Sequence, residues 1–200
     1  MTKRLTRDEV LNRFRAEIEA HRPLFVASCG TGLVAKFLEK GGCDMAGVYN
    51  SVKLGAGGAG SMMGMWPVSD ANGLMFEYAT REILPVVHEM PIMAGVNAND
   101  PTRDIPLFLD ELLRVGIIAV NNFPTVGLVD GNFRKVLEQT GITFEKRDPD
   151  AQDRQAEGHA GRRPGVQQGR DGENRSRVRP RCVHLSRGND DRGIDRLQAP

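Results

Sequence analysis

Residues 24–42 read LFVASCGTGLVAKFLEKGG, and they contain one complete strand–turn–helix unit. The apolar run at 24–28 is short and continuous, which is typical of a strand buried in a parallel sheet. The glycines at 30 and 32 predict a tight turn. Residues 33–40 have a helical pattern, and the glycine pair at 41–42 predicts the end of that helix. The rest of the chain repeats this unit.

Three further apolar runs follow, each introduced or ended by glycine or proline, at residues 45–49, 92–96 and 117–120. Helical patterns separate them at 71–84, between Asp104 and Gly116, and at 132–139. An amphipathic helix precedes the first unit, with a capping box at Thr6 and Glu9. Residues 50–69, rich in glycine and methionine, are predicted to form a long loop. Four alternating strands and helices predict an α/β fold with a parallel sheet, in either a doubly wound sheet or a closed barrel.

Composition excludes several classes of function. The 200 residues carry a net charge of +1, which gives no reason to expect a nucleic-acid or anionic-membrane partner. No apolar run approaches the roughly 18–20 residues of a membrane span. Basic residues at the N-terminus are not followed by an apolar segment, so we expect no signal peptide and a cytoplasmic chain. The three cysteines are widely spaced, which disfavours a disulfide framework.

The charge is distributed unevenly along the chain. Residues 1–146 have 15 Lys and Arg against 17 Asp and Glu, whereas residues 147–200 have 12 Arg, no Lys and 9 Asp and Glu. The second segment also lacks Phe, Trp, Tyr and Met, so it cannot bury enough apolar area to offset its ordering entropy. We therefore predict a folded α/β domain at 1–146 and a disordered tail at 147–200. A nucleic-acid-binding arm and a linker are alternatives to the hypothesis we favour, an out-of-frame translation of a GC-rich gene.

The first turn matches a dinucleotide-binding fingerprint only loosely. Gly30, Gly32 and Ala35 have the required spacing, and glycines there let backbone N–H groups approach an anion at a helix N-terminus. However, the second strand ends in Tyr-Asn-Ser at 49–51 rather than in the acidic residue that binds a ribose. This disfavours a nicotinamide cofactor, and leaves a simple tight turn or an anion pocket.

Several stretches together carry a family resemblance, of which the segment Asn122–Gly127 is the most specific. The stretches are HRP at 21–23, GTGLVAK at 30–36, GGCD at 41–44, VYNS at 48–51, PIMAGV at 91–96, DPTRD at 100–104 and NFPTVGLVDGNFR at 122–134. In these stretches, over about residues 7–146, the chain resembles the phosphoenolpyruvate hydrolase-like family of TIM barrels, also called TIM-barrel signal transduction proteins. The resemblance implies a partial TIM-barrel domain at 1–146.

The resemblance implies a (β/α)8 barrel, of which this sequence contains the N-terminal four β/α units. It also implies a distant similarity to enzymes that act on phosphoenolpyruvate or phosphonopyruvate, and thus a lyase or hydrolase of a small phosphorylated or 2-oxo acid. A non-catalytic regulatory or assembly module is the alternative, since a fold does not fix a function. Mg²⁺ would suit such chemistry, although no dense carboxylate cluster follows the four strands. Without the second half of the barrel, we expect this chain to be inactive.

The candidate site follows from the barrel, because active sites of TIM barrels lie at the carboxyl ends of the strands. Amide and hydroxyl side chains and exposed backbone N–H groups there can bind the oxygens of a small anionic substrate. Helix capping and turn formation are the alternative roles for such asparagines. No catalytic residue is assigned. The predicted substrate-binding residues are Gly30, Thr31, Gly32, Asn50, Ser51, Asn97, Asn121, Asn122 and Thr125.

Three other features have two interpretations each. Cys29 could be a nucleophile near a helix N-terminus, but a small buried residue is favoured. Asp100 and Asp104 could bind a metal ion or act as a general base, but a turn role for Asp100 and a helix cap for Asp104 are favoured. The glycine-rich stretch 55–64 and its methionines could be a lid, or could pack with Trp66 on the barrel rim.

Half of a barrel leaves two strand edges without neighbours. Exposed edges favour self-association, so we expect the chain alone to be insoluble, molten, or a homodimer in which two half-barrels cover each other.

Overall fold

A computed structural model describes residues 5–143 and the backbone of residues 183–184. The strands form one parallel sheet in the order β1-β2-β3-β4-β5. Its first four strands follow sequence order, as in consecutive units of a (β/α) barrel, which confirms the predicted α/β fold. The strands are β1 (Val26–Ser28), β2 (Met45–Val48), β3 (Ile92–Val96), β4 (Ala119–Asn122) and β5 (Val183–His184).

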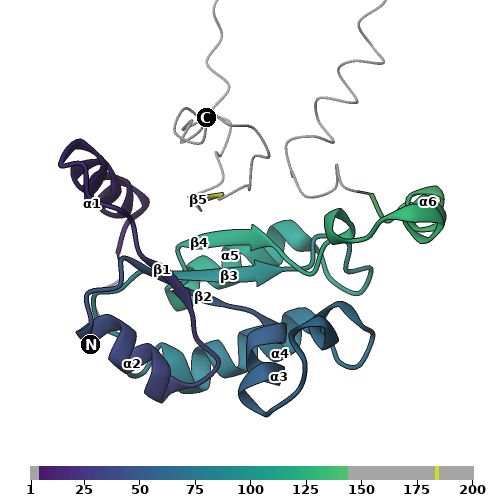
Figure 1. The fold of residues 1–200 in the computed structure, drawn as a ribbon, viewed down its shortest axis with the longest axis horizontal. Coiled ribbons are helices and arrows are strands. Elements are labelled where there is room, and N and C mark those ends of the chain that lie inside the picture. The colour runs from purple at the N-terminus through teal and green to yellow at the C-terminus, as the bar shows by residue number, and fades with distance from the viewer. Residues whose placement is uncertain (1–4, 144–182, 185–200) are drawn as a thin grey trace, which may run out of the picture.

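The helices occupy three positions around the sheet (Figure 1). The helices α2, α3 and α4 lie along one side of it, α1 lies at the end where the strands begin, and α6 projects beyond the end where they finish. The helices are α1 (Arg7–Glu19), α2 (Gly32–Lys40), α3 (Asn50–Ala56), α4 (Ala71–Tyr78), α5 (Ile105–Val115) and α6 (Gly131–Gln139), with the shorter η1 (Ser61–Met65), η2 (Ala79–Ile83, a π-helix) and η3 (Val126–Leu128).

Helix starts follow the predicted capping signals. The Thr6 and Glu9 capping box is formed at α1. The Asp70 carboxylate accepts a hydrogen bond from Gly73 N at 2.8 Å, and Asp104 accepts one from Leu107 N at 3.1 Å. These bonds satisfy backbone donors that have no partner within the helix. The predicted cap role of Asp104 is therefore confirmed.

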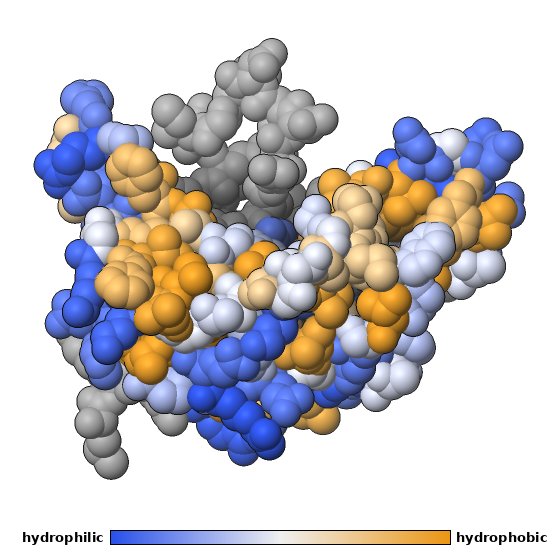
Figure 2. Space-filling model, turned by 60° about the horizontal axis from the view of Figure 1, so that its bottom comes forward, coloured by the Kyte–Doolittle hydropathy of each residue, from blue (hydrophilic) through white to orange (hydrophobic). Residues whose placement is uncertain are grey.

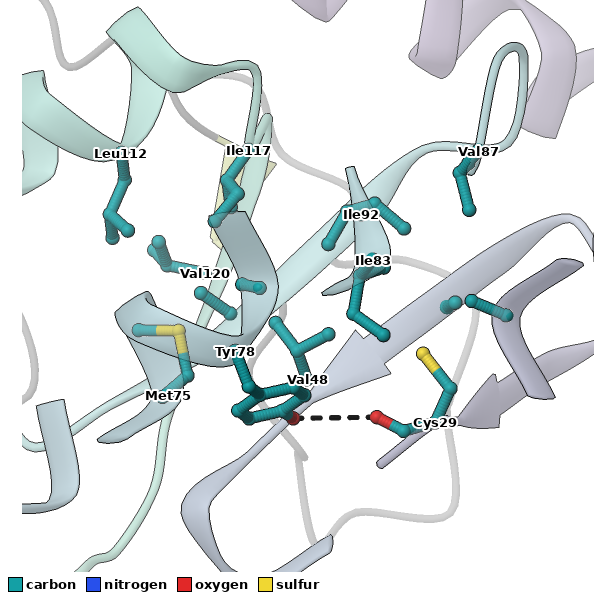
Figure 3. Packing of buried hydrophobic residues seen from close by; sticks show 14 of the residues in the cluster. Cys29, Val48, Met75, Tyr78, Ile83, Val87, Ile92, Leu112, Ile117 and Val120 are labelled. Atoms are coloured by element: carbon teal, nitrogen blue, oxygen red, sulfur yellow. Dashed lines mark hydrogen bonds between the residues drawn. The ribbon is translucent and has the colours of Figure 1, made fainter. Parts of the chain in front are cut away.

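We call the side of the sheet along which α2, α3 and α4 lie its outer side, and the opposite side its inner face. The larger core lies between the sheet and the helices on the outer side (Figure 3). The β3 residues Ile92, Ala94 and Val96 point into it and alternate with residues that face the other way. Tyr78 of α4 is 2% exposed and joins this core. This core attaches the helices to the sheet and so sets where each strand ends.

A smaller core closes the inner face near the start of the strands. Val10 and Phe14 of α1 pack with Met45 of β2 and Met93 of β3. The helix α1 thus covers the inner face where the strands begin, and leaves the carboxyl ends of the strands to form the site.

The segment before β3 is fixed at the same end by a carboxylate from α2. Glu39 Oε1 accepts hydrogen bonds from the backbone N–H groups of His88, Glu89 and Met90 at 2.8, 2.6 and 3.0 Å. Partial burial opposes the charge, but these three donors outweigh it and lower the pKa of Glu39. The contact links α2 to the start of β3.

Two sequence predictions about this fold are wrong. The run at 24–28 was expected to be buried, but Val26 is 49% exposed, because β1 is the first strand of the sheet and pairs only with β2 among the described residues. The expected loop at 50–69 contains α3 and η1. The predictions of disorder and of a frameshift at 147–200 fall on residues outside those described, apart from β5.

Candidate functional site

Tyr49 lies at the centre of the inner face at the carboxyl end of the sheet. Its ring packs against the backbone of Gly47 in β2 and Gly95 in β3, where a Cβ atom would overlap it. Its hydroxyl oxygen accepts a hydrogen bond from Asn121 Nδ2 of β4 at 3.3 Å. The Phe123 ring meets it edge to face, with centroids 5.5 Å apart. Residues from three strands are therefore brought together here.

Of these residues, only Asn121 was among the predicted site residues. Tyr49 is the last residue of the second apolar run. Its position in the sequence predicted the end of a strand, and did not predict that its ring would lie over the neighbouring strand. The available signal was the pair of glycines at 47 and 95. Alternation places both on the inner face, and residues without side chains on adjacent strands leave room for a large one.

Asn50 and Ser51 are both buried, at 3% and 8% exposure. Asn50 Nδ2 donates to the carbonyl oxygen of Gly64 at 2.8 Å. Gly64 also lies directly against Ser51, with no space for a side chain. These two predicted site residues therefore hold η1 onto α3. Asn50 Oδ1 is buried without a hydrogen-bond partner among the described residues, so it can accept a bond from an added donor.

Asn122 and Thr125 form a turn at the end of β4. Asn122 Oδ1 accepts a hydrogen bond from Ala98 N at 3.5 Å, and Asn122 Nδ2 donates to Thr125 Oγ1 at 3.4 Å. Thr125 Oγ1 in turn accepts a hydrogen bond from Gly127 N at 3.2 Å. The geometry gives both side chains a structural role in the turn, and their contact with a substrate stays a prediction.

Asn97 is held by a buried asparagine that sequence reasoning missed. Asn72 of α4 is fully buried, accepts from Asn97 N at 2.9 Å and donates to Asn97 O at 3.2 Å. Asn72 Nδ2 also donates to Asp100 Oδ2 at 2.8 Å. One amide thus fixes the whole loop after β3. Asn97 Oδ1 accepts from Asn99 N at 3.1 Å, which stabilises the same loop.

Asp100 has the turn role that the sequence favoured. Its Oδ1 accepts from the backbone N–H and the hydroxyl of Thr102, at 2.9 and 2.6 Å. Burial opposes its charge, but the bonds from Thr102 and Asn72 and the nearby Arg103 lower its pKa. The carboxylate is therefore ionised and engaged in the loop.

The first turn packs tightly against its neighbours. Thr31 Oγ1 accepts from Val34 N at 3.4 Å and caps α2. Gly30 lies against the carbonyl of Val52, and Gly32 lies against that of Glu82, so neither position has space for a Cβ atom. This close packing accounts for a residue without a side chain at both positions. Anion binding by this turn stays a prediction.

Cys29 is fully buried at the end of β1. Burial is the main cause that raises the pKa of its thiol to about 11, so the thiol is protonated at neutral pH. The Tyr78 hydroxyl is placed to donate to the carbonyl oxygens of Cys29, at 3.4 Å (Figure 3), and Tyr49, at 3.2 Å. The favoured interpretation of Cys29 as a buried structural residue agrees with this environment.

An apolar groove runs between the η1 segment and the η3–α6 segment, with a volume of about 670 Å³. Both segments follow strands at their carboxyl ends, so the groove lies on the site's side of the sheet. Its lining carries no charged side chain and consists of Ala59, Gly60, Met62, Met63, Met65, Trp66, Leu128, Val129 and Phe133. Met62, Met63 and Trp66 are 65%, 42% and 63% exposed along one wall of the groove, and both the lid and the rim packing stay predictions.

Among residues 5–143, no three His, Cys, Asp or Glu side chains gather as metal ligands would. The described side chains therefore do not fit a carboxylate-bound Mg²⁺ site. None of the helices described has the length and apolarity needed to cross a bilayer.

A family model described as phosphoenolpyruvate hydrolase-like matches residues 9–148. The chain belongs to this family. The chain is 46% identical over 138 residues to the "ToMV resistance protein Tm-1" of Solanum lycopersicum, covering 69% of this chain. It is 46% identical over 135 residues to the "ToMV susceptible protein tm-1" of the same plant, covering 68% of this chain. This phosphoenolpyruvate hydrolase-like chain spans only 18% of the length of each tomato protein.

Among solved structures, a phosphonopyruvate hydrolase in complex with oxalate and Mg²⁺ resembles the family member described here. The TM-score is 0.44 at 16% sequence identity, over 72% of this chain and 50% of that chain.

Proposed function

We propose that this domain supplies half of a barrel active site that binds a small 2-oxo or phosphorylated acid. The Tyr49–Asn121 pair carries the proposal, because it places a phenol and an amide from two strands on the inner face at the carboxyl ends. Both groups are neutral hydrogen-bonding groups that can bind carboxylate or carbonyl oxygens without a fixed counter-charge. The family's description, phosphoenolpyruvate hydrolase-like, supports the same class of substrate.

The chemistry we propose for a complete barrel is a lyase or hydrolase reaction on such an acid. Cleaving a C–C or C–P bond of the carbon next to a 2-oxo group leaves the electron pair on that carbon, from which it delocalises to the carbonyl oxygen as an enolate. In a hydrolase the departing phosphoryl group is transferred to water, in a lyase the departing carbon leaves as a carbonyl compound, and in both cases the enolate then takes up a proton. Preorganised donors stabilise the charge that develops on that oxygen. In this role Asn121 Nδ2 would bind the oxygen, and Tyr49 would fix the direction of the amide. No proton-transfer residue is assigned among residues 5–143.

We further propose that this chain alone binds such acids without turning them over, because residues 5–143 provide four strand ends and β5 adds a fifth, where a complete barrel has eight. The binding test is calorimetric titration of the full chain with oxalate, pyruvate and phosphoenolpyruvate, each with and without Mg²⁺. We expect at least one acid to bind. Asn121→Ala should weaken it by about tenfold or more, as expected for a lost hydrogen bond to a charged ligand.

The matched control is Asn132→Ala, which removes an exposed amide of α6 and should leave affinity unchanged. Dependence of binding on Mg²⁺ would support a metal site completed by the ligand. The binding proposal fails if none of the three acids binds, or if both alanine variants bind as the parent chain does. Release of pyruvate from phosphoenolpyruvate by the parent chain would contradict the proposed lack of turnover.

A non-catalytic binding module is the second candidate. The observation that favours it is that Asn97, Asn122 and Thr125 are already engaged in turns. The names of the tomato relatives also concern resistance and susceptibility rather than a reaction. Ligand binding without turnover in a longer relative that contains all eight units would select this candidate. A cytoplasmic location likewise stays a prediction, which cell fractionation would test.

A further inference from the structure

A group of large apolar side chains is exposed at the β1 end of the sheet. We call it the edge patch, and Figure 2 shows apolar surface at the end of the molecule where α2 lies. Each member is more than two-fifths exposed, whereas the residues of the larger core are buried. Its members are Phe25 (65%), Val26 (49%), Leu33 (67%), Val34 (44%) and Phe37 (62%).

The edge patch combines a helix face with a strand edge. Leu33 and Phe37 are four residues apart on α2, so they lie on one face of the helix, with Val34 beside them. Val26 belongs to β1, which pairs only with β2 within the described part of the chain. The other edge of β1 therefore presents backbone N–H and C=O groups that can pair with a further strand.

We propose that the edge patch is the interface of a two-fold symmetric dimer formed by a second copy of this chain. A two-fold axis brings one patch onto the same patch of the partner, so the surface needs no other complement. The two β1 edges would then pair antiparallel, and the two α2 faces would pack together. This inference is independent of the proposed function, because the patch contains none of the candidate site residues.

The area of the edge patch agrees with what a stable dimer needs. A standard interface buries about 800 Å² per partner, of which about 56–58% is apolar, or roughly 450 Å². At about 150–200 Å² for each large apolar side chain, the exposed fractions of the patch leave roughly 500 Å² per copy. Lys36 and Lys40 are exposed, and they lie three residues after Leu33 and Phe37 respectively, so they border the patch on the same face of α2. They would stay solvated at the rim, as charged residues in interfaces usually do.

The opposite end of the molecule offers a matched comparison. Phe133 of α6 is 56% exposed and Leu128 is also 56% exposed, so they are as apolar and nearly as accessible as Phe37 and Leu33. A general tendency of exposed apolar residues to aggregate would involve both ends equally. The proposed interface involves the edge patch alone.

The test is sedimentation velocity of the full chain over a range of concentrations, for the parent and for two variants. The parent should form a species of twice the 22.0 kDa chain mass. Phe37→Gln should raise the dimer Kd by at least about tenfold, as for a central aromatic contact. Phe133→Gln should leave the Kd unchanged. Because both side chains are exposed, neither change should unfold the chain, which circular dichroism would verify.

Hydrogen exchange gives a second readout. Amides of β1 should be protected at concentrations above the Kd and exchange faster on dilution. A parent chain that is monomeric throughout, or whose β1 amides are protected independently of concentration, would overturn the proposal. An assembly that persists in Phe37→Gln, or that Phe133→Gln dissociates, would also overturn it.

Discussion

The two ends of the strands are built on different principles. Where the strands begin, the contacts are apolar or charge-assisted hydrogen bonds. Phe14 of α1 packs with Met45 and Met93, and the Glu39 carboxylate accepts bonds from three backbone N–H groups. Where the strands finish, the contacts are amide hydrogen bonds of 2.8–3.5 Å made by Asn50, Asn72 and Asn122. The first end is suited to stability and the second to recognition.

This difference has an energetic basis. Buried apolar side chains contribute several kcal/mol each, whereas a neutral hydrogen bond contributes about 1 kcal/mol net. Groups held by weak bonds can exchange a protein partner for a ligand at little cost. Substitutions at the two ends should therefore differ in size and in kind.

The largest effect is expected for Phe14→Ala. Phe14 is 3% exposed in the smaller core, and removing a buried Phe side chain costs about 3–5 kcal/mol. Urea unfolding followed by circular dichroism should show a lower midpoint at an unchanged slope. Phe133→Ala, at an exposed position, is the control and should change stability by less than about 0.5 kcal/mol. Equal losses in both variants would remove the distinction between the α1 contact and ordinary surface.

Glu39→Gln should cost about 1–3 kcal/mol, because an amide oxygen replaces a carboxylate that accepts three N–H donors. The pKa of Glu39 is lowered below its ordinary value of 4.5 on folding. Its contribution to stability is therefore present above the unfolded pKa and is lost as pH falls through the folded pKa. The unfolding free energies of the parent and the variant should differ at pH 7 and converge once the pH falls below the folded-state pKa of Glu39.

The control for this change is Glu77→Gln, which alters an exposed carboxylate paired with Arg81 at 3.3 Å. Surface pairs contribute little, so its loss should lie within about 0.5 kcal/mol at both pH values. A Glu39→Gln loss that does not depend on pH would mean that charge is not what the three donors require.

Asn122→Ala should lower stability by less than about 1 kcal/mol, since its two hydrogen bonds are long, at 3.4 and 3.5 Å. Its effect on ligand affinity decides whether the amide also meets the substrate. Affinity that falls tenfold at nearly unchanged stability would place Asn122 in contact with the ligand. A loss of more than about 2 kcal/mol in the free protein would instead mean that this end is as rigid as the other.

The smallest effect is expected for alkylation of Cys29. Its side chain is fully buried and its pKa is raised to about 11, so iodoacetamide at pH 8 should leave it unmodified in the folded chain. Mass spectrometry of the peptide should show full labelling only after unfolding in urea. Rapid labelling of the native protein would restore the nucleophile interpretation.

The sequence predicts the repeating units well because their signals are local. Capping side chains at Thr6, Asp70 and Asp104 and the stop at Gly116, with φ of 107°, act within a few residues. The helix α3 was missed because Tyr49, at its N-cap, makes no side-chain cap bond, and the helix has only seven residues. Burial of β1 was predicted wrongly because an apolar run does not reveal which elements will cover it.

The candidate site was predicted only in part for a related reason. Its position at the strand ends follows from the fold class, and Asn121 was found in that way. The amide of Asn72 and the ring of Tyr49 were not found, because their partners are 25 and 72 residues away. Nothing near Asn72 in the sequence indicates its contacts, whereas Gly47 and Gly95 leave room for the Tyr49 ring without indicating its bond to Asn121.

The glycines under the Tyr49 ring constrain the order in which this sequence can change. A methyl group at Gly47 or Gly95 would overlap the ring, so alanine at either position should be tolerated only after Tyr49 has become smaller. The reverse order, a smaller residue at 49 first, leaves a void and costs stability but no overlap. Substitutions at these three positions should therefore be epistatic: alanine at Gly47 or Gly95 should be tolerated only in a chain that already has a smaller residue at Tyr49.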